Sequence, residues 1–95
     1  MSQENVLASG TGAGTSDPIF VSRTPVAVCA FGTLGSDTGA LERLASDGSW
    51  AAVFDGGEAV ALSATKPQVE ITGAGTYRVV FEARTAAIGV DAQTV

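Results

Sequence analysis

Four carboxylates beside turn-forming residues are the first candidates for chemistry in this sequence: Asp37, Asp47, Asp55 and Glu58. Such side chains bind calcium, or act as a paired acid and base, when the fold brings them together. Asp37 and Asp47 each follow a serine, and Asp55 begins an Asp-Gly-Gly run. Because an aspartate in this setting bonds to nearby backbone amides, we interpret these residues as turn formers, with a calcium site as the alternative.

Nucleophilic and phosphate-binding patterns are incomplete in this chain. No histidine is present, which excludes the commonest general base, serine–histidine and cysteine–histidine nucleophiles, and most zinc sites. Ser63 and Lys66 match the S-x-x-K letters of penicillin-recognising acyl enzymes, but Pro67 follows in strand-like sequence where a helix is needed. Residues 10–15, GTGAGT, complete neither common phosphate-binding glycine pattern. We therefore expect no catalytic residue, cofactor or metal, and a protein that is not an enzyme.

The apolar and aromatic side chains are expected to build the core. Cys29, the one cysteine, lies within VAVCAF and is expected to be a small buried apolar residue. Trp50, Phe54, Tyr77 and Phe81 offer two readings, a sugar-stacking platform or core packing. They fall on regular strand alternations, which favours the core.

Charge excludes two classes of partner. The formal net charge is −5, from ten acidic and five basic residues, and the basic residues are scattered along the chain. A nucleic-acid binder needs clustered cations, and an anionic membrane surface attracts them too, so we expect neither partner. The first residues lack the positive and apolar regions of a secretory signal, so we expect the protein to be made in the cytoplasm.

Short apolar runs alternate with turn residues from Asp17 onward, a pattern typical of β-sandwiches and barrels. The pattern predicts an all-β fold, a single antiparallel β-sandwich, immunoglobulin-like or jelly-roll-like, with about seven or eight short strands. Asp47-Gly48 and Asp55-Gly56-Gly57 are strong hairpin signals. The expected strands cover residues 18–22, 26–32, 40–46, 49–54, 58–64, 67–73 and 76–84, with a short edge strand near 88–90. The spacing of residues 40–46 fits a helix as well as a strand, and that alternative stays open.

Residues 76–84 alternate most clearly. The residues expected to face inward are Tyr77, Val79, Phe81 and Ala83, and those expected to face outward are Arg78, Val80, Glu82 and Arg84.

Residues 1–16 are polar and glycine-rich, and we expect them to form an extended N-terminal arm ahead of a β-sandwich domain over 17–95. An arm of this composition cannot bury enough of its own surface to offset the entropy of ordering it. The sequence therefore predicts that another protein chain holds the arm.

Residues 41–80 carry a resemblance to a known class. A strand runs into Asp47-Gly48, a tryptophan strand begins at Trp50, and a later strand begins with Gly75-Thr76-Tyr77-Arg78. In these features the chain resembles small structural proteins of tailed bacteriophages. The resemblance implies a β-sandwich component of the virion.

Resemblance and composition together favour a capsid decoration or cement protein, which stabilises the phage head through arm and edge-strand contacts. Its expected partners are the major capsid protein or other virion proteins, and further copies of itself in a homo-oligomer. The alternative is a receptor- or glycan-binding module of a phage tail or fibre. A small hydrolase is the remotest reading, because histidine is absent.

Overall fold

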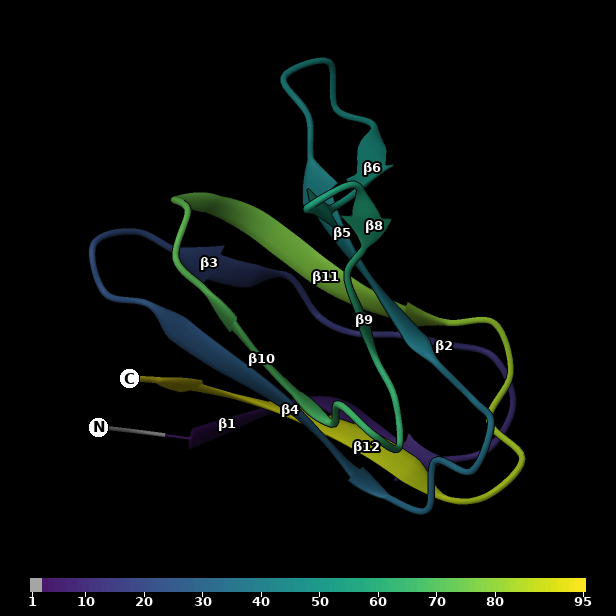
Figure 1. Cartoon of the computed structure of the whole chain (residues 1–95). Helices are drawn as coiled ribbons and strands as arrows, with labels where there is room; N and C mark the ends of the chain where they lie inside the picture. The colour runs from purple at the N-terminus through teal and green to yellow at the C-terminus, as the bar shows by residue number, and fades with distance from the viewer. Residues whose placement is uncertain (1–2) are drawn as a thin grey trace.

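The computed structural model describes residues 3–95, which form twelve strands and no helix (Figure 1). Two sheets face each other across an apolar interior, and their strand pairs are antiparallel. The predicted antiparallel β-sandwich is confirmed.

Strands of the two sheets alternate along much of the chain. The first sheet contains, in spatial order, β1 (Gln3–Gly10), β12 (Ile88–Thr94), β4 (Val26–Gly32) and β10 (Gln68–Ile71). The second sheet has β11 (Gly75–Phe81) and β5 (Gly39–Leu44) at its centre, with β2 (Gly14–Thr15) and β3 (Ile19–Val21) beside β11 and β6 (Trp50–Ala52) and β9 (Ala61–Leu62) beside β5. The short strands β7 (Phe54–Asp55) and β8 (Glu58–Ala59) form a separate hairpin.

The core lies between the sheets and follows the period-two pattern of the sequence. On β11 the inward residues Tyr77, Val79 and Phe81 are 5%, 0% and 1% exposed, whereas the residues between them are half-buried. Tyr77 also donates its hydroxyl to the carbonyl of Gly73 at 2.8 Å, which satisfies its polar end beside the core. The predicted alternation is confirmed as far as Phe81, where β11 ends, but Ala83, predicted to face inward, is exposed.

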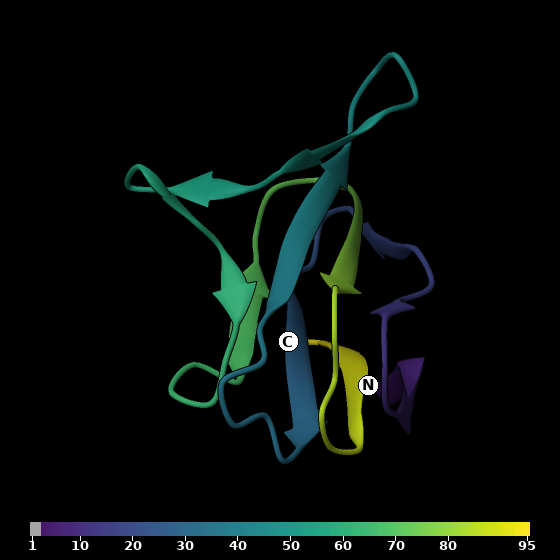
Figure 2. The same cartoon turned by 90° about the vertical axis from the view of Figure 1, so that its right-hand side faces the viewer.

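Both predicted hairpins are present, and their tips extend away from the sandwich (Figure 2). Gly56 and Gly57 connect β7 to β8 with φ values of 63° and 85°, the left-handed pair that a two-residue type I′ turn requires. Residues 45–49 connect β5 to β6, and the N–H of Ala45 donates to the carbonyl of Ser49 at 2.7 Å.

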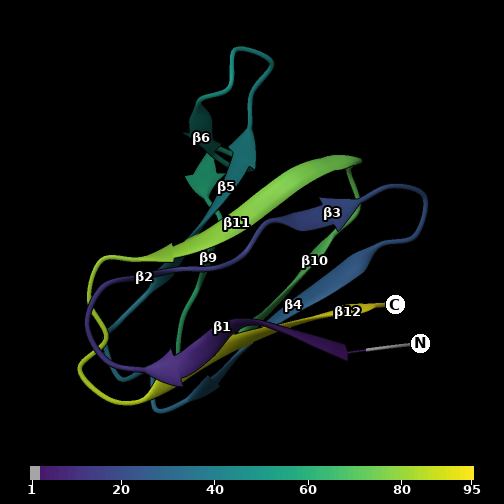
Figure 3. The same cartoon turned by 180° about the vertical axis from the view of Figure 1, so that it is seen from behind.

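The N-terminal segment differs from the prediction. Residues 3–10 are not an extended arm but strand β1, which pairs with β12 at the edge of the first sheet (Figure 3). Val6 is 4% exposed and belongs to the core. This segment therefore pairs with a strand of its own domain and adds a residue to the core. Residues 1–2, also assigned to the arm, lie outside the described residues.

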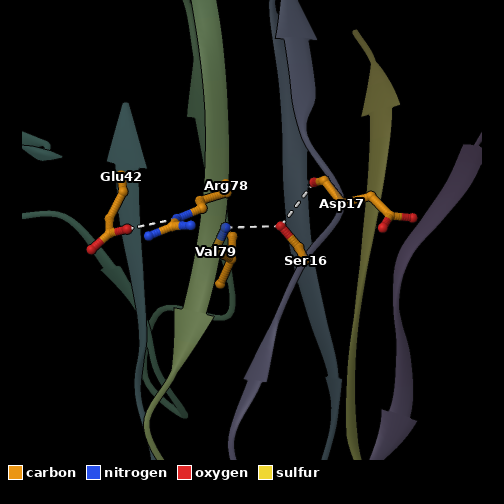
Figure 4. Close-up of polar contacts among 5 residues, drawn as sticks. All are labelled: Ser16, Asp17, Glu42, Arg78 and Val79. Carbon is orange, nitrogen blue, oxygen red and sulfur yellow. Dashed lines mark hydrogen bonds and ion pairs between the residues drawn. The ribbon is translucent and has the colours of Figure 1, made fainter. Parts of the chain in front are cut away.

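Ser16 directly follows β2 and is buried. The N–H of Ser16 donates to the carbonyl of Val79 at 2.9 Å, and its Oγ accepts from the Val79 N–H at 2.9 Å (Figure 4). The next N–H, of Asp17, donates to the carbonyl of Val6 at 2.7 Å. These bonds connect one short segment to both sheets.

The glycine-rich run at 10–14 folds around the side chain of Arg84, which is only 8% exposed. Its guanidinium donates to the carbonyls of Gly12 at 2.9 Å and Ile88 at 2.8 Å, and to those of Ala8 and Thr11 at 3.2 and 3.4 Å. Arg84 was expected to point outward as a continuation of β11, but β11 ends at Phe81 and Arg84 turns inside.

Close packing against this guanidinium explains a glycine at position 14. A Cβ there would lie 2.8 Å from Nη2 of Arg84, whereas a Cβ at Gly10 would lie 3.6 Å away, an ordinary contact. The glycines that predicted a flexible arm thus let the backbone carbonyls of this segment approach a buried cation.

The last strand also differs from the prediction. A short edge strand near 88–90 was expected, but β12 runs from Ile88 to Thr94 and lies between β1 and β4. Ile88 and Val90 are fully buried, and β12 is an interior strand of its sheet because β1 covers its outer side.

Removing the guanidinium should weaken the fold strongly. We expect Arg84→Met to lower the free energy of unfolding by about 3 kcal/mol, because several buried carbonyls lose a charged donor. Gly14→Ala should lower it by roughly 1–3 kcal/mol through the close contact, and Gly10→Ala by less than about 0.5 kcal/mol. Urea denaturation measures all three.

The matched control for the loss of an arginine is Arg23→Met, because Arg23 is exposed. The account of Arg84 is wrong if Arg84→Met and Arg23→Met have equal stability. A double variant of positions 14 and 84 should be less destabilised than the sum of the single variants, since both act on one contact.

Candidate functional site

The four candidate carboxylates do not converge. Asp47 accepts hydrogen bonds from the N–H of Ser49 at 2.9 Å and from its hydroxyl at 2.6 Å, within the β5–β6 turn. Asp55 and Glu58 are exposed and face each other across the β7–β8 hairpin. Within residues 3–95, no group of three or more histidine, cysteine, aspartate or glutamate side chains is placed to hold a metal ion.

Asp37 has a longer-range role than the predicted local turn. Its Oδ2 accepts from the N–H and the hydroxyl of Thr85 at 2.8 and 2.9 Å, which ties the loop after β4 to the loop after β11. These bonds, the backbone one first, hold the pKa of Asp37 below its ordinary value. Hydrogen bonds from the Ser49 side chain and backbone lower the pKa of Asp47 in the same way.

The remaining sequence patterns have structural roles in the described residues. Ser63 Oγ lies 3.3 Å from Thr65 Oγ1 and accepts from the N–H of Lys66 at 3.2 Å, so the S-x-x-K letters form a turn. Cys29 is half-buried rather than buried, because it points away from the core on β4 between two inward residues, Val28 and Ala30. Among residues 3–95 there is no helix with the length and apolar character needed to cross a membrane.

The aromatic residues divide into two groups. Tyr77 and Phe81 are buried as predicted, but Trp50 is half-buried and Phe54 is 64% exposed. The expected strand over 49–54 is interrupted at Val53, whose N–H donates to the carbonyl of Leu41. After this point the chain leaves the second sheet in the β7–β8 hairpin, which carries Phe54 away from the core.

Trp50 lies on the outer face of the second sheet, where it pairs across strands with Leu44. The neighbouring strands place further side chains on the same face, because they alternate with buried residues. We call this surface the Trp50 face; it comprises Phe20, Glu42, Leu44, Trp50, Arg78 and Val80. Phe20 is 74% exposed and Leu44 is 37% exposed, so the face presents apolar side chains to solvent.

Arg78 joins three strands at the centre of the Trp50 face. Its Nε lies 2.7 Å from Oε1 of Glu42 on β5, and its Cζ lies 4.4 Å from the centroid of the Trp50 ring on β6 (Figure 4 shows the Arg78–Glu42 pair). The guanidinium is thereby held over one face of the indole, with an acid fixing its position. A partly exposed pair of this kind contributes at most about 1 kcal/mol to folding.

The Trp50 face combines residue types that are frequent at protein interfaces. Tryptophan and arginine are among the residues that contribute most at protein interfaces, particularly when their positions are fixed before binding, and phenylalanine is enriched there. A hollow of about 450 Å³ lies where Glu42 and Val80 meet the loop after β4, and its lining does not include Phe20, Trp50 or Arg78. A contact made at this face would bury apolar area, and the charges of Arg78 and Glu42 would orient the bound surface.

Part of the Trp50 face was predicted from the sequence. The outward positions of Arg78 and Val80 were predicted from the alternation of β11, and Glu42 lies in a predicted strand. What the sequence does not reveal is that β5 separates β11 from β6, which places Glu42 between Arg78 and Trp50. Strand order in a sandwich depends on contacts far apart in the chain.

Acid should weaken the link between the two loops. The folded-state pKa of Asp37 lies below its ordinary value of 3.8, so the stabilisation is complete above that value and is lost as pH falls through the lowered pKa. We expect Asp37→Asn to flatten the fall of melting temperature below about pH 4. Asp55→Asn is the control, and an equal flattening in both variants would contradict the assignment.

Comparison with known proteins reveals a shared fold and little shared sequence. No protein-family model matches the chain, and no curated protein matches it significantly. Among solved structures, the SPBc2 prophage-derived protein YomS is similar over 98% of this chain and 90% of its own, with a TM-score of 0.76 and 11% sequence identity. At this identity the similarity establishes that the two chains have the same fold.

Proposed function

We propose that this chain is a structural protein of a tailed-bacteriophage virion, and that it decorates or cements the head. The observation that carries the proposal is the Trp50 face, a preorganised apolar surface on a small sandwich. The phage assignment is supported by the fold shared with a prophage-derived protein. It is also supported by the resemblance of residues 41–80 to small phage structural proteins.

The proposed partners are the major capsid protein or other virion proteins, with further copies of the chain completing the assembly. A small acidic domain with scattered basic residues favours protein partners over nucleic acid or an anionic membrane. The work proposed is attachment without catalysis, and the proposed location is the virion. Contact through the Trp50 face and through edge strands replaces contact through an arm, because residues 3–10 are committed to the first sheet.

A glycan-binding module of the tail is the competing function. Sugars stack on open aromatic faces. Phe20, which is exposed, and Trp50, which is half-buried, are the aromatic side chains of this face that such a site would use. However, the guanidinium of Arg78 already covers one face of the Trp50 ring. The Trp50 face therefore fits a protein surface better than a saccharide.

Attachment to heads should depend on the Trp50 face. In co-sedimentation with phage heads that lack this protein, we expect Phe20→Asp and Leu44→Asp each to weaken binding by about tenfold or more, because each places a charge in an apolar contact. Both side chains are exposed, so the variants should fold. Val95→Asp is the matched control, since Val95 is an exposed apolar residue outside the face.

Undiminished binding of both variants would remove the Trp50 face from the proposal. Binding of the unaltered protein to tails or host polysaccharide, but not to heads, would overturn the decoration role.

A further inference from the structure

A second surface lies along β10, on the opposite edge of the first sheet from β1. A groove of about 400 Å³ runs between β10 and the β7–β8 hairpin, with Gln68–Thr72 along one wall and Phe54 and Asp55 along the other. Figure 2 shows the hairpin extending away from the sandwich on this side of the molecule. The groove is separate from the Trp50 face, which lies on the outer face of the other sheet.

The backbone of β10 is available on the side of the groove. Within residues 3–95, β10 pairs with β4 alone. The N–H of Ala30 donates to the carbonyl of Pro67, and the antiparallel register then directs the backbone groups of Val69 toward β4. By the same alternation, the N–H and C=O groups of Gln68 and Glu70 point away from β4, toward the groove.

The inner part of the groove is apolar. Val69 and Ile71 face inward from β10, and Leu41 and Tyr77 reach the groove from the second sheet. Val53, Val60 and exposed Phe54 line it from the base of the hairpin. A strand added to β10 would place every second side chain against these residues.

The rims of the groove are acidic. Glu70 lies on the β10 side and Asp55 on the hairpin side, with Lys66 near one end. A strand lying between two carboxylates gains from basic residues at the positions that alternate with its apolar ones. The backbone of β10 does not distinguish one extended strand from another, whereas the acidic rims favour a strand that carries basic residues.

We propose that β10 binds an extended segment of a partner protein, in which apolar and basic residues alternate, by strand addition. A second copy of this chain is a poorer occupant, because it would bring one acidic β10 edge against another in a chain of net charge −5. The inference rests on the proposed function only in that a virion protein supplies the segment.

A blocked heptapeptide of alternating valine and lysine tests the proposal by NMR titration of the full chain. We expect shifts concentrated in β10 and the β7–β8 hairpin. Replacing every lysine with glutamate should weaken binding by about tenfold or more. Methylating alternate backbone nitrogens, which removes the donors that strand addition needs, should abolish binding.

A protein variant isolates the backbone contribution. Glu70→Pro removes an N–H that points away from β4, a place where an edge strand accepts proline, and should abolish binding. Glu70→Gln keeps that N–H and should weaken binding only a few-fold. The methylated peptide keeps the test valid even if the proline variant fails to fold.

Three results would overturn the inference: no shifts at β10 with about 1 mM peptide, equal binding of the methylated peptide, or self-association of the protein that Glu70→Pro abolishes. The last result would assign the edge to a second copy. A negative result with the peptide does not affect the proposal that the protein attaches to heads. A negative result with heads does not affect the proposal that β10 binds the peptide, so the two proposals are tested separately.

Discussion

The buried guanidinium of Arg84 is the interaction on which the rest of the structure depends. A charge placed in a protein interior must be matched by hydrogen-bond acceptors, and here four backbone carbonyls supply them. Three of the four belong to residues 8–12, at the end of β1 and in the turn before β2. Arg84 therefore fixes the place where the chain passes from the first sheet to the second, and Ser16, just after β2, bonds to Val79 of the second sheet.

This constraint determines which surfaces are free. Because β1 covers the outer side of β12, that edge of the first sheet is already used, and the N-terminal residues 3–16 are part of the sandwich. The two surfaces proposed to bind partners are the Trp50 face and the β10 edge. One presents apolar side chains around an oriented arginine, and the other presents unused backbone groups above an apolar floor. The proposed attachment to a protein partner uses such surfaces.

Local sequence signals predicted local structure well. The Asp-Gly runs gave the two hairpins, and the alternation of residues 76–81 gave the inward face of β11. The errors concern contacts distant in sequence. From the local sequence alone, the glycines at 10–14 indicate flexibility. In the structure this segment bonds to Arg84, which lies some seventy positions later. Trp50 was assigned to the core because nothing local indicates that its strand lies at the edge of the sheet. The Trp50 face itself depends on strand order, which the sequence does not encode locally.

Hydrogen exchange of the isolated protein tests the central claim most directly, namely that residues 3–16 belong to the folded domain. The account predicts that backbone amides in β1 and the N–H of Ser16 are protected, at levels approaching those of β12, in the absence of any partner. If residues 3–16 exchange at the rate of an unfolded chain while β12 and β4 stay protected, the segment is an arm and this account is contradicted.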